Sequence, residues 1–305
     1  MESIKYGDRT ADRLREILGD GSVFENEPMS RHTTFRIGGP ADFFVTPRTP
    51  SEISRTLDYC RLEGIPCAVI GNGSNLLVSD EGVRGVVVRL GKEFSRIIAE
   101  GETVRAEAGA LLSQVAGAAA EAELTGMEFA GGIPGTLGGA CIMNAGAYGG
   151  EMKQILFEVN ALLPDGTQKI FRQEEMGLGY RTSTFMKENL IVLEAVLHLK
   201  KGESSRIRAI SEELKRKRQE KQPLDLPSAG STFKRPEGYF AGKLIMDAGL
   251  RGYRVGGAQV SEKHCGFVVN TGGATAADVR QLISEVRNIV RDRFGVTLEP
   301  EVRFL

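Results

Sequence analysis

The sequence has no tryptophan, three histidines, four cysteines and almost no net charge, and each shortage narrows the functions open to it. The 39 Lys and Arg balance 40 Asp and Glu, so no basic surface is expected for DNA, RNA or an anionic membrane. The cysteines, Cys60, Cys67, Cys141 and Cys265, form no CxxC pair, which is typical of a reducing compartment and excludes a disulfide scaffold. The histidines lie far apart without an HExxH pattern, so we expect no metal site.

Long apolar runs are also missing. No stretch of about 18 apolar residues occurs, so we expect no membrane-spanning helix. The first twenty residues are too charged for a signal peptide, which predicts a cytoplasmic protein. At roughly 100 to 200 residues per domain, 305 residues predict two domains or three small ones.

Glycine, by contrast, is in surplus. The chain has 38 glycines where average usage predicts roughly 21, and the excess gathers in residues 126–150 and 238–273. Glycine is required where the backbone takes positive φ or where a ligand lies against the main chain. The two clusters therefore indicate either loops against a large ligand or tight turns, and both interpretations stay open.

Helices and strands both follow from the hydrophobic periodicity. It predicts helices over 10–18, 51–63, 111–122, 205–220, 239–248 and 275–294. It predicts strands over 43–46, 67–70, 86–90, 103–108, 155–163, 168–171, 190–199, 266–270 and 296–305. Pro164-Asp165-Gly166 indicates a hairpin turn, and Thr275 with Asp278 indicates a capping box. The basic run 215–218 is interpreted as a solvated helix end.

The sequence does not match three common motifs of nucleotide-binding proteins and hydrolases. The Gly71–Leu76 segment has leucine where a dinucleotide fingerprint needs its third glycine, and a strand rather than a helix is expected after it. Gly91-Lys92 and Gly242-Lys243 lack the Ser or Thr of a P-loop. No GxSxG elbow occurs. A Rossmann domain, a P-loop NTPase and a serine hydrolase are therefore disfavoured.

Two glycine-rich stretches remain as candidate binding elements. Val69–Asn75 reads as a strand running into a small polar loop, whose backbone N–H groups can form an anion site, although a plain turn would look similar. Ala130–Ala140 reads as an extended wall that is poor in side chains. Together they suit a long, flat cofactor that carries a diphosphate.

Seven ordered motifs from residue 31 to the C-terminus resemble the UDP-N-acetylenolpyruvoylglucosamine reductase family, also called UDP-N-acetylmuramate dehydrogenase. They are Arg31–Gly39, Gly71–Asn75, Gly131–Gly139, Met143–Gly149, Tyr180–Ser183, Ser228–Lys234 and Glu299–Arg303. The resemblance implies an α+β protein: a two-part FAD-binding domain of the vanillyl-alcohol-oxidase (PCMH) type, then a smaller α+β substrate-binding domain. We place an N-terminal helical segment at 1–30, the FAD-binding domain at 31–204 and the substrate domain at 205–305.

The resemblance also implies the reaction and its residues. NADPH reduces noncovalently held FAD, and the enolpyruvyl double bond of UDP-N-acetylglucosamine enolpyruvate is then reduced to UDP-N-acetylmuramate for peptidoglycan. Arg181 matches an arginine that stabilises the enolate, Glu301 a glutamate that assists it, and Ser231 the proton donor. Taken singly, these residues could be a structural ion pair, a polar strand position and a loop hydroxyl.

Ligand-binding residues are carried over in the same way. The resemblance implies cofactor contacts by Gly71, Asn72, Gly73, Ser74, Asn75, Gly132, Pro134, Gly135, Gly138 and Gly146. It implies substrate contacts by Tyr148, Tyr180, Lys221, Arg235 and His264. Arg235 stands where many members have asparagine, and His264 could equally be a loop histidine. The short interval between Arg181 and Ser231 predicts the compact type II subclass, and we expect a monomer.

Two other functions remain as alternatives. One is a flavin oxidase of the same superfamily, although no motif for covalent flavin attachment is evident. The other is a catalytically silent module that binds a sugar nucleotide or a flavin.

Overall fold

The computed structural model describes residues 8–305, so the first seven residues of the predicted N-terminal segment lie outside it. By their contacts, the residues group into two units. Among the described residues, the first unit comprises 8–25, 43–72 and 85–218, and the second comprises 26–42, 73–84 and 219–305. The units are therefore interleaved along the chain. The predicted domain ranges 1–30, 31–204 and 205–305 are contiguous and stay a prediction about folding domains.

A four-stranded sheet with the order β1-β2-β5-β3 follows the first helix, α1. The bounds are α1 Asp8–Leu18, β1 Val23–Pro28, β2 Pro40–Val45, α2 Pro50–Leu62, β3 Cys67–Ile70 and β5 Val83–Arg89. Helix α2 begins after Thr49, whose Oγ1 accepts a hydrogen bond from the Glu52 N–H at 3.1 Å. Strand β3 pairs in parallel with β5, so β5 separates the two strands that flank α2.

An antiparallel five-stranded sheet with the order β12-β11-β13-β7-β6 is the main sheet of the first unit. Its strands are β6 Ile97–Glu100, β7 Thr103–Glu107, β11 Leu156–Leu162, β12 Gln168–Arg172 and β13 Ile191–His198. The predicted hairpin is confirmed, because β11 and β12 pair across Pro164-Asp165-Gly166. One face carries polar pairs such as Arg105 with Glu194, as expected for a sheet that faces water on one side.

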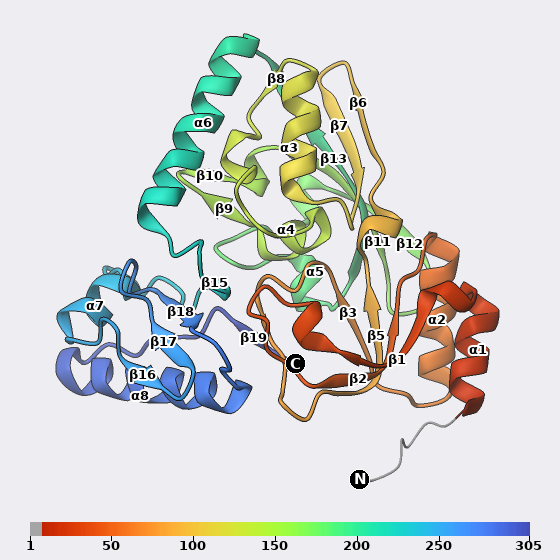
Figure 1. The fold of residues 1–305 in the computed structure, drawn as a ribbon. Coiled ribbons are helices and arrows are strands. Elements are labelled where there is room, and N and C mark those ends of the chain that lie inside the picture. Colours follow the sequence, from red (N-terminus) through yellow and green to blue (C-terminus); the bar gives the residue numbers. More distant parts are fainter. Residues whose placement is uncertain (1–7) are drawn as a thin grey trace. The chain divides into compact units, whose positions relative to one another are not determined.

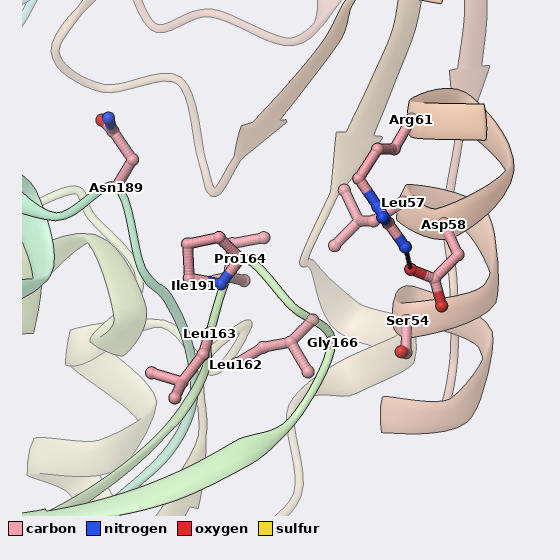
Figure 2. A pocket seen from close by; sticks show the side chains of 10 residues that line it. All are labelled: Ser54, Leu57, Asp58, Arg61, Leu162, Leu163, Pro164, Gly166, Asn189 and Ile191. Carbon is pink, nitrogen blue, oxygen red and sulfur yellow. Dashed lines mark hydrogen bonds and ion pairs between the residues drawn. The ribbon is translucent and has the colours of Figure 1, made fainter. Parts of the chain in front are cut away.

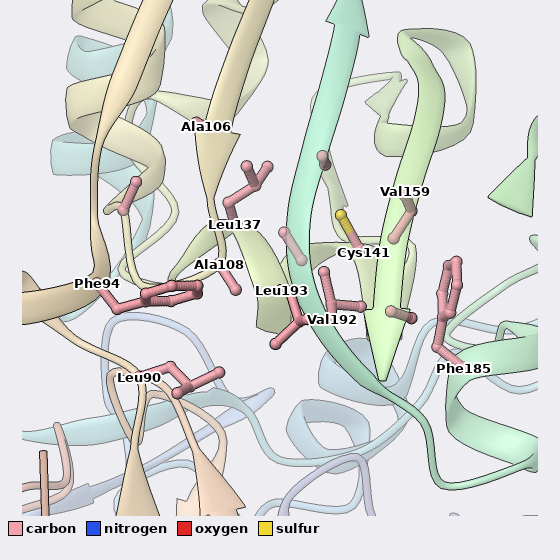
Figure 3. Close-up of a cluster of buried hydrophobic side chains, with 14 of the residues drawn as sticks. Leu90, Phe94, Ala106, Ala108, Leu137, Cys141, Val159, Phe185, Val192 and Leu193 are labelled. Atoms are coloured by element: carbon pink, nitrogen blue, oxygen red, sulfur yellow. The ribbon is translucent and has the colours of Figure 1, made fainter. Parts of the chain in front are cut away.

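Helices α3 and α4 contact the strands of this sheet (Figure 1). Buried apolar side chains of both helices and of the sheet belong to one core. The remaining elements of the unit are α3 Leu112–Glu121, β8 Leu124–Thr125, α4 Leu137–Met143, β9 Gly146–Ala147, β10 Gly150–Glu151, α5 Thr184–Lys187 and β14 Lys200–Lys201. Figure 3 shows part of the core, where Leu137 and Cys141 of α4 lie among Val159, Val192 and other apolar side chains. Full burial of each such side chain contributes about 1.5–3 kcal/mol.

The second unit contains an antiparallel sheet with the order β15-β18-β17-β16, which packs with α7 and α8 around its own core. Its elements are β4 Leu76–Leu77, β15 Ser228–Ser231, α7 Ala241–Asp247, β16 Arg254–Val255, β17 Ala258–Val260, β18 Phe267–Asn270, α8 Ala276–Phe294 and β19 Arg303–Phe304. The predicted capping box is confirmed, because Thr275 Oγ1 accepts from the Asp278 N–H at 3.0 Å. Helix α6, Ser204–Lys221, runs across the boundary at residue 218.

Two predictions about local structure are wrong. Residues 296–305 do not form one strand; only Arg303–Phe304 does, paired in parallel with β4, and the preceding segment is held by isolated hydrogen bonds. The stretch Ala130–Ala140 is not extended throughout, because Leu137 begins helix α4. Leu137 and Cys141, four residues apart, are both buried, so tertiary packing overrides the low helix propensity of two glycines. Within residues 8–305, no helix is long and apolar enough to cross a bilayer.

Candidate functional site

Arg181 lies at the tip of a tight turn in the first unit. Gly179 and Thr182 exchange backbone hydrogen bonds of 3.0 and 3.4 Å, which leaves Tyr180 and Arg181 as the two residues of the turn. Arg181 has φ of +53°, a conformation that few residues other than glycine adopt. Its guanidinium carbon lies 5.3 Å from the centre of the exposed Tyr180 ring. Tyr180, a substrate candidate, and Arg181, a catalytic candidate, therefore lie together at the tip of this turn.

Tyr148 lies at the tip of a second tight turn in the same unit. Strands β9 and β10 pair Ala147 with Gly150, and the two residues between them, Tyr148 and Gly149, both have positive φ. This is the geometry of a type I′ hairpin. The turn leaves the Tyr148 side chain exposed, as a substrate-contacting residue must be.

Arg218 is a residue whose environment the sequence-based interpretation got wrong. It is not part of a solvated helix end: it is only 9% exposed, and its Nη1 donates to the Gly132 carbonyl at 2.5 Å. Its guanidinium carbon lies 5.7 Å from the Tyr148 ring centre. Burial lowers the pKa of Arg218, and Tyr148 opposes that shift. The available signal was helical spacing, because Arg218 falls four residues after Leu214, which packs against the core.

The two predicted cofactor-binding stretches meet within the first unit. Asn72 Nδ2 donates to the Pro134 carbonyl at 2.7 Å. A Cβ on Gly71 would lie 2.2 Å from Thr136 Oγ1, so this glycine is required for the approach of the second stretch. Gly138 is also required, because a Cβ there would lie 2.8 Å from the Ala108 Cβ. These contacts are between protein atoms, and they place Gly71 and Asn72 beside the second stretch.

The second glycine cluster, residues 238–273, is explained by turns. Six of its glycines have positive φ: Gly238, Gly249, Gly252, Gly256, Gly272 and Gly273. The others approach neighbouring groups closely; a Cβ on Gly257, for example, would lie 2.5 Å from the Ala274 nitrogen. Of the two interpretations left open by the sequence, tight turns apply to this cluster.

Ser231 follows a β-bulge in the second unit. Strand β15 pairs Ser228 with Val269 and Ser231 with Phe267, so β15 contains one more residue than β18 between these pairs. Gly230, at φ +75°, takes the conformation that the extra residue requires. A bulge changes the direction of the residues that follow it, and Ser231 is left half-buried instead of enclosed in the sheet.

Glu301 is held beside the Ser231 strand. The Glu301 N–H donates to the Thr232 carbonyl at 2.8 Å, and its own carbonyl accepts from Asn75 Nδ2 at 3.0 Å. Glu299, two residues earlier, is instead paired with Lys234, whose Nζ lies 2.9 Å from its Oε2 and lowers the pKa of Glu299. The two glutamates therefore have different surroundings: the Glu299 side chain pairs with Lys234, whereas the Glu301 backbone bonds to Thr232 and Asn75.

Hydrogen bonds of Thr34 and Asn75 link four predicted motifs in the second unit. Thr34 N–H donates to the Gly73 carbonyl at 3.4 Å, and Thr34 Oγ1 donates to the Ser228 carbonyl at 2.7 Å. Arg303 N–H donates to the Asn75 carbonyl at 2.9 Å. The second part of the glycine loop therefore joins the segments that carry Ser231 and Glu301.

The other substrate candidates of the C-terminal region have diverse environments. Lys221 is the exposed last residue of α6. The Arg235 guanidinium carbon lies 3.9 Å from the Phe240 ring centre, and both side chains are exposed. His264 is partly buried, its Nδ1 accepts from the Gly266 N–H at 3.1 Å, and burial lowers its pKa. The lowered pKa favours the neutral imidazole, and in that form the hydrogen bond that Nδ1 accepts places the proton on Nε2.

A shallow cavity of about 160 Å³ in the first unit contains none of the predicted site residues. It lies between α2 and the β11–β12 turn, and Figure 2 shows its lining. Its charged residues already pair, because Arg61 Nη2 donates to Asp58 Oδ1 at 2.8 Å. The cavity is therefore separate from the residues that the sequence analysis predicts to bind or to catalyse.

Comparisons with known proteins cover nearly the whole chain. Residues 222–305 match a family described as UDP-N-acetylenolpyruvoylglucosamine reductase, C-terminal domain, and residues 41–172 match an FAD binding domain. A UDP-N-acetylenolpyruvoylglucosamine reductase from Caldanaerobacter subterraneus subsp. tengcongensis is 52% identical over 294 residues, which covers 96% of this chain and 97% of the relative.

Solved structures agree with these relatives. The reductase from Thermus caldophilus is 38% identical, with a TM-score of 0.79 over 91% of this chain and 97% of that one. A 4-ethylphenol oxidase from Gulosibacter chungangensis is 16% identical, with a TM-score of 0.50 over 63% of this chain and 42% of that one, and supports the fold alone. The predicted α+β fold, with a PCMH-type FAD-binding domain before a C-terminal domain, is confirmed.

Proposed function

The chain belongs to the UDP-N-acetylenolpyruvoylglucosamine reductase family, and from this membership we propose how its residues carry out the reaction. It is an oxidoreductase of peptidoglycan precursor synthesis, with FAD as cofactor and NADPH as reductant. Its substrate is UDP-N-acetylglucosamine enolpyruvate. The roles of individual residues are the proposal.

The glycine stretches have the donor chemistry that FAD requires. Residues 71–75 and 132–138 offer backbone N–H groups and neutral Ser and Asn side chains, which suit a diphosphate without a cluster of lysines. The contact of Asn72 with Pro134 supports their acting together. We assign FAD binding to Gly71, Asn72, Gly73, Ser74, Asn75, Gly132, Pro134, Gly135, Gly138 and Gly146. When bound, the flavin supplies the hydride for the alkene.

One observation carries the assignment of the chemistry. Asn75, Thr232 and Glu301 come from three motifs that are far apart in sequence, yet backbone and amide hydrogen bonds hold them together. A protein that used these motifs only as surface loops would have no need to join them. We therefore assign the proton donor and the supporting carboxyl to Ser231 and Glu301 within this group.

Each proposed catalytic residue has a defined task. Hydride addition leaves negative charge that spreads from the substrate carbon into its carboxylate, and the planar guanidinium of Arg181 suits a carboxylate that gains charge. If burial or a neighbouring group holds the Glu301 carboxyl protonated, it stabilises the enol intermediate. Ser231 then donates its hydroxyl proton to the carbanionic carbon, which is basic enough to accept it when the geometry is fixed.

The nucleotide part of the substrate is assigned to Tyr148, Tyr180, Lys221, Arg235 and His264. The exposed rings and cations among them can contact uracil and diphosphate. His264 has the least support as a cation, because burial lowers its pKa and its Nδ1 already accepts a backbone hydrogen bond. It can still donate from Nε2.

We further propose that the enzyme is a cytoplasmic monomer of the compact type II subclass. Four free cysteines support a reducing compartment. The short interval from Arg181 to Ser231 supports the subclass. Sedimentation equilibrium tests the monomer directly, and a dimer mass would contradict it.

NADPH oxidation with and without UDP-N-acetylglucosamine enolpyruvate tests the function. Oxidation that depends on this substrate is expected. Rapid oxidation with oxygen alone would favour the oxidase alternative, and a colourless protein that binds no FAD would exclude both flavoenzyme interpretations.

Ser231→Ala tests the proton donor. We expect FAD to be reduced by NADPH at a normal rate, whereas reduction of the sugar nucleotide falls by roughly 10²- to 10⁴-fold or more. Ser228→Ala, at the other end of the same strand, is the control and should retain both half-reactions. Normal turnover of the Ser231 variant would refute the role.

A further inference from the structure

Asn144 is a buried polar residue that the proposed reaction does not use. It ends helix α4 in the left-handed conformation, with φ of +42°, and is only 1% exposed. Its Oδ1 accepts from the Lys153 N–H at 2.8 Å, and its Nδ2 donates to Glu151 Oε2 at 2.8 Å. Nδ2 also donates to the Gly179 carbonyl at 3.0 Å. The amide group is thus fully engaged within the protein.

The Gly179 carbonyl opens the turn that carries Arg181. The other end of this turn is fastened to the same helix end, because Ser183 Oγ donates to the Ile142 carbonyl at 2.7 Å. Ser183 Oγ also accepts from the Met186 N–H at 3.1 Å, which caps α5. Residues 142–144 therefore hold both ends of the segment from Gly179 to Ser183.

The conformation of Arg181 requires such support. A non-glycine residue at φ of +53° lies in a sparsely populated region and persists there only where its surroundings over-determine it. A long, flexible arginine reaches a defined point at low entropic cost only if its backbone is fixed. Misplacement of a catalytic group by about 1 Å can cost on the order of 10²-fold in rate.

We propose that Asn144 is a positioning residue for Arg181, acting through its hydrogen bond to the Gly179 carbonyl. The inference rests on the role proposed above for Arg181. Glu151 orients the amide, and the left-handed cap places it where α4 ends. The motif Met143–Gly149 thus contributes an internal support for the carboxylate-binding turn in addition to the exposed Tyr148.

Asn144→Gly is the principal test, because glycine adopts positive φ without strain and only the side chain is lost. The matched control is Asn189→Gly, since Asn189 also has φ of +53° but is exposed and outside this turn. With FAD-loaded protein, we expect the Asn144 variant to keep its flavin and its reduction by NADPH. Its reduction of the sugar nucleotide should fall by about 10- to 100-fold, in line with misplacement of one group. The control should match the unsubstituted protein.

A double-variant cycle separates positioning from general support. In an Arg181→Ala background, Asn144→Gly should cause no further loss of sugar-nucleotide reduction, because the group that it positions is gone. An equal loss in both backgrounds, loss of FAD from the single variant, or normal turnover would each overturn the inference. If Arg181→Ala itself has no effect, it is the proposed role of Arg181 that fails.

Asn144→Asp provides a second variant with nearly unchanged volume. It keeps an acceptor for Lys153 but directs a carboxylate at the Gly179 carbonyl and at Glu151. The same selective defect is expected, and it should shrink as the pH is lowered and the new carboxyl regains a donor proton. A defect that is independent of pH and affects both half-reactions would contradict the inference.

Discussion

At the residue scale, the conformation and close packing of the protein itself already require glycine in the candidate cofactor loop, even without a ligand. Gly73 has φ of +62°, and a Cβ there would lie 2.0 Å from the His32 carbonyl oxygen. Gly101 has nearly the same φ, +61°, but a Cβ there would meet no atom of the described residues within 4 Å. The two positions therefore separate the cost of backbone strain from the cost of a clash.

Gly73→Ala should lower both stability and flavin content. The left-handed conformation costs roughly 1–2 kcal/mol for a residue with a Cβ, and the clash must also move the His32–Thr33 backbone. Gly101→Ala carries the first cost alone and should purify with normal flavin content, measured as the ratio of absorbance at the flavin and protein bands. Equal flavin content in the two variants would show that the loop tolerates displacement.

At the scale of elements, two carboxylates accept hydrogen bonds from backbone N–H groups at the start of α8 and fix where this helix begins. Asp80 accepts from the Ala276 and Ala277 N–H groups at 2.7 and 2.9 Å, and Asp278 accepts from the Thr275 and Gly257 N–H groups. The Thr275 N–H, followed by the Gly257 N–H, lowers the pKa of Asp278 below its usual 3.8. A carboxyl whose pKa is lowered on folding stabilises the protein above the unfolded value, and this contribution is lost as the pH falls through the folded value.

Asp278→Asn should therefore lower the free energy of unfolding at neutral pH, measured by urea denaturation, by about 0.3–1 kcal/mol, as expected for an exposed charge at a helix N-terminus. The difference from the unsubstituted protein should shrink as the pH falls below 3.8. Asp292→Asn, in the last turn of the same helix, is the control and should not destabilise at neutral pH. A difference that stays constant between pH 7 and pH 3 would contradict the electrostatic explanation.

At the scale of the whole molecule, balanced charge and abundant glycine both fit nucleotide binding by backbone N–H groups instead of by a basic surface. A net charge of −1 argues against a generally basic surface, and we therefore propose that backbone N–H groups and a few placed cations bind the diphosphates. Binding of a ligand to the folded state alone stabilises it, by about 2.7 kcal/mol when the free ligand is at a hundred times its dissociation constant.

FAD added to flavin-free protein should accordingly raise the thermal unfolding midpoint. Riboflavin, which has the ring system without the diphosphate, should raise it much less at the same concentration. Scanning fluorimetry at several concentrations of both ligands measures the difference. Equal shifts would show that the glycine stretches do not bind the diphosphate.

Sequence alone determined much of this protein because the relevant signals are local. The capping box at Thr275, the Pro164-Asp165-Gly166 turn and the strand over 190–199 depend on neighbouring residues, and the structure confirms each, the strand as Ile191–His198. The motif order sufficed to predict the family, and the comparisons confirm it. The catalytic roles of Arg181, Ser231 and Glu301 stay predictions.

Tertiary structure decided whatever depends on contacts between distant segments. Only packing shows that Leu137 begins a helix, that Arg218 is buried against Gly132, and that residues 296–302 are held by isolated hydrogen bonds. Only the fold joins Asn75 to Glu301 and Asn144 to the Arg181 turn. The physical reason is that local patterns specify backbone conformation, whereas the partner of a buried amide or guanidinium is set by segments that meet only after the chain has folded.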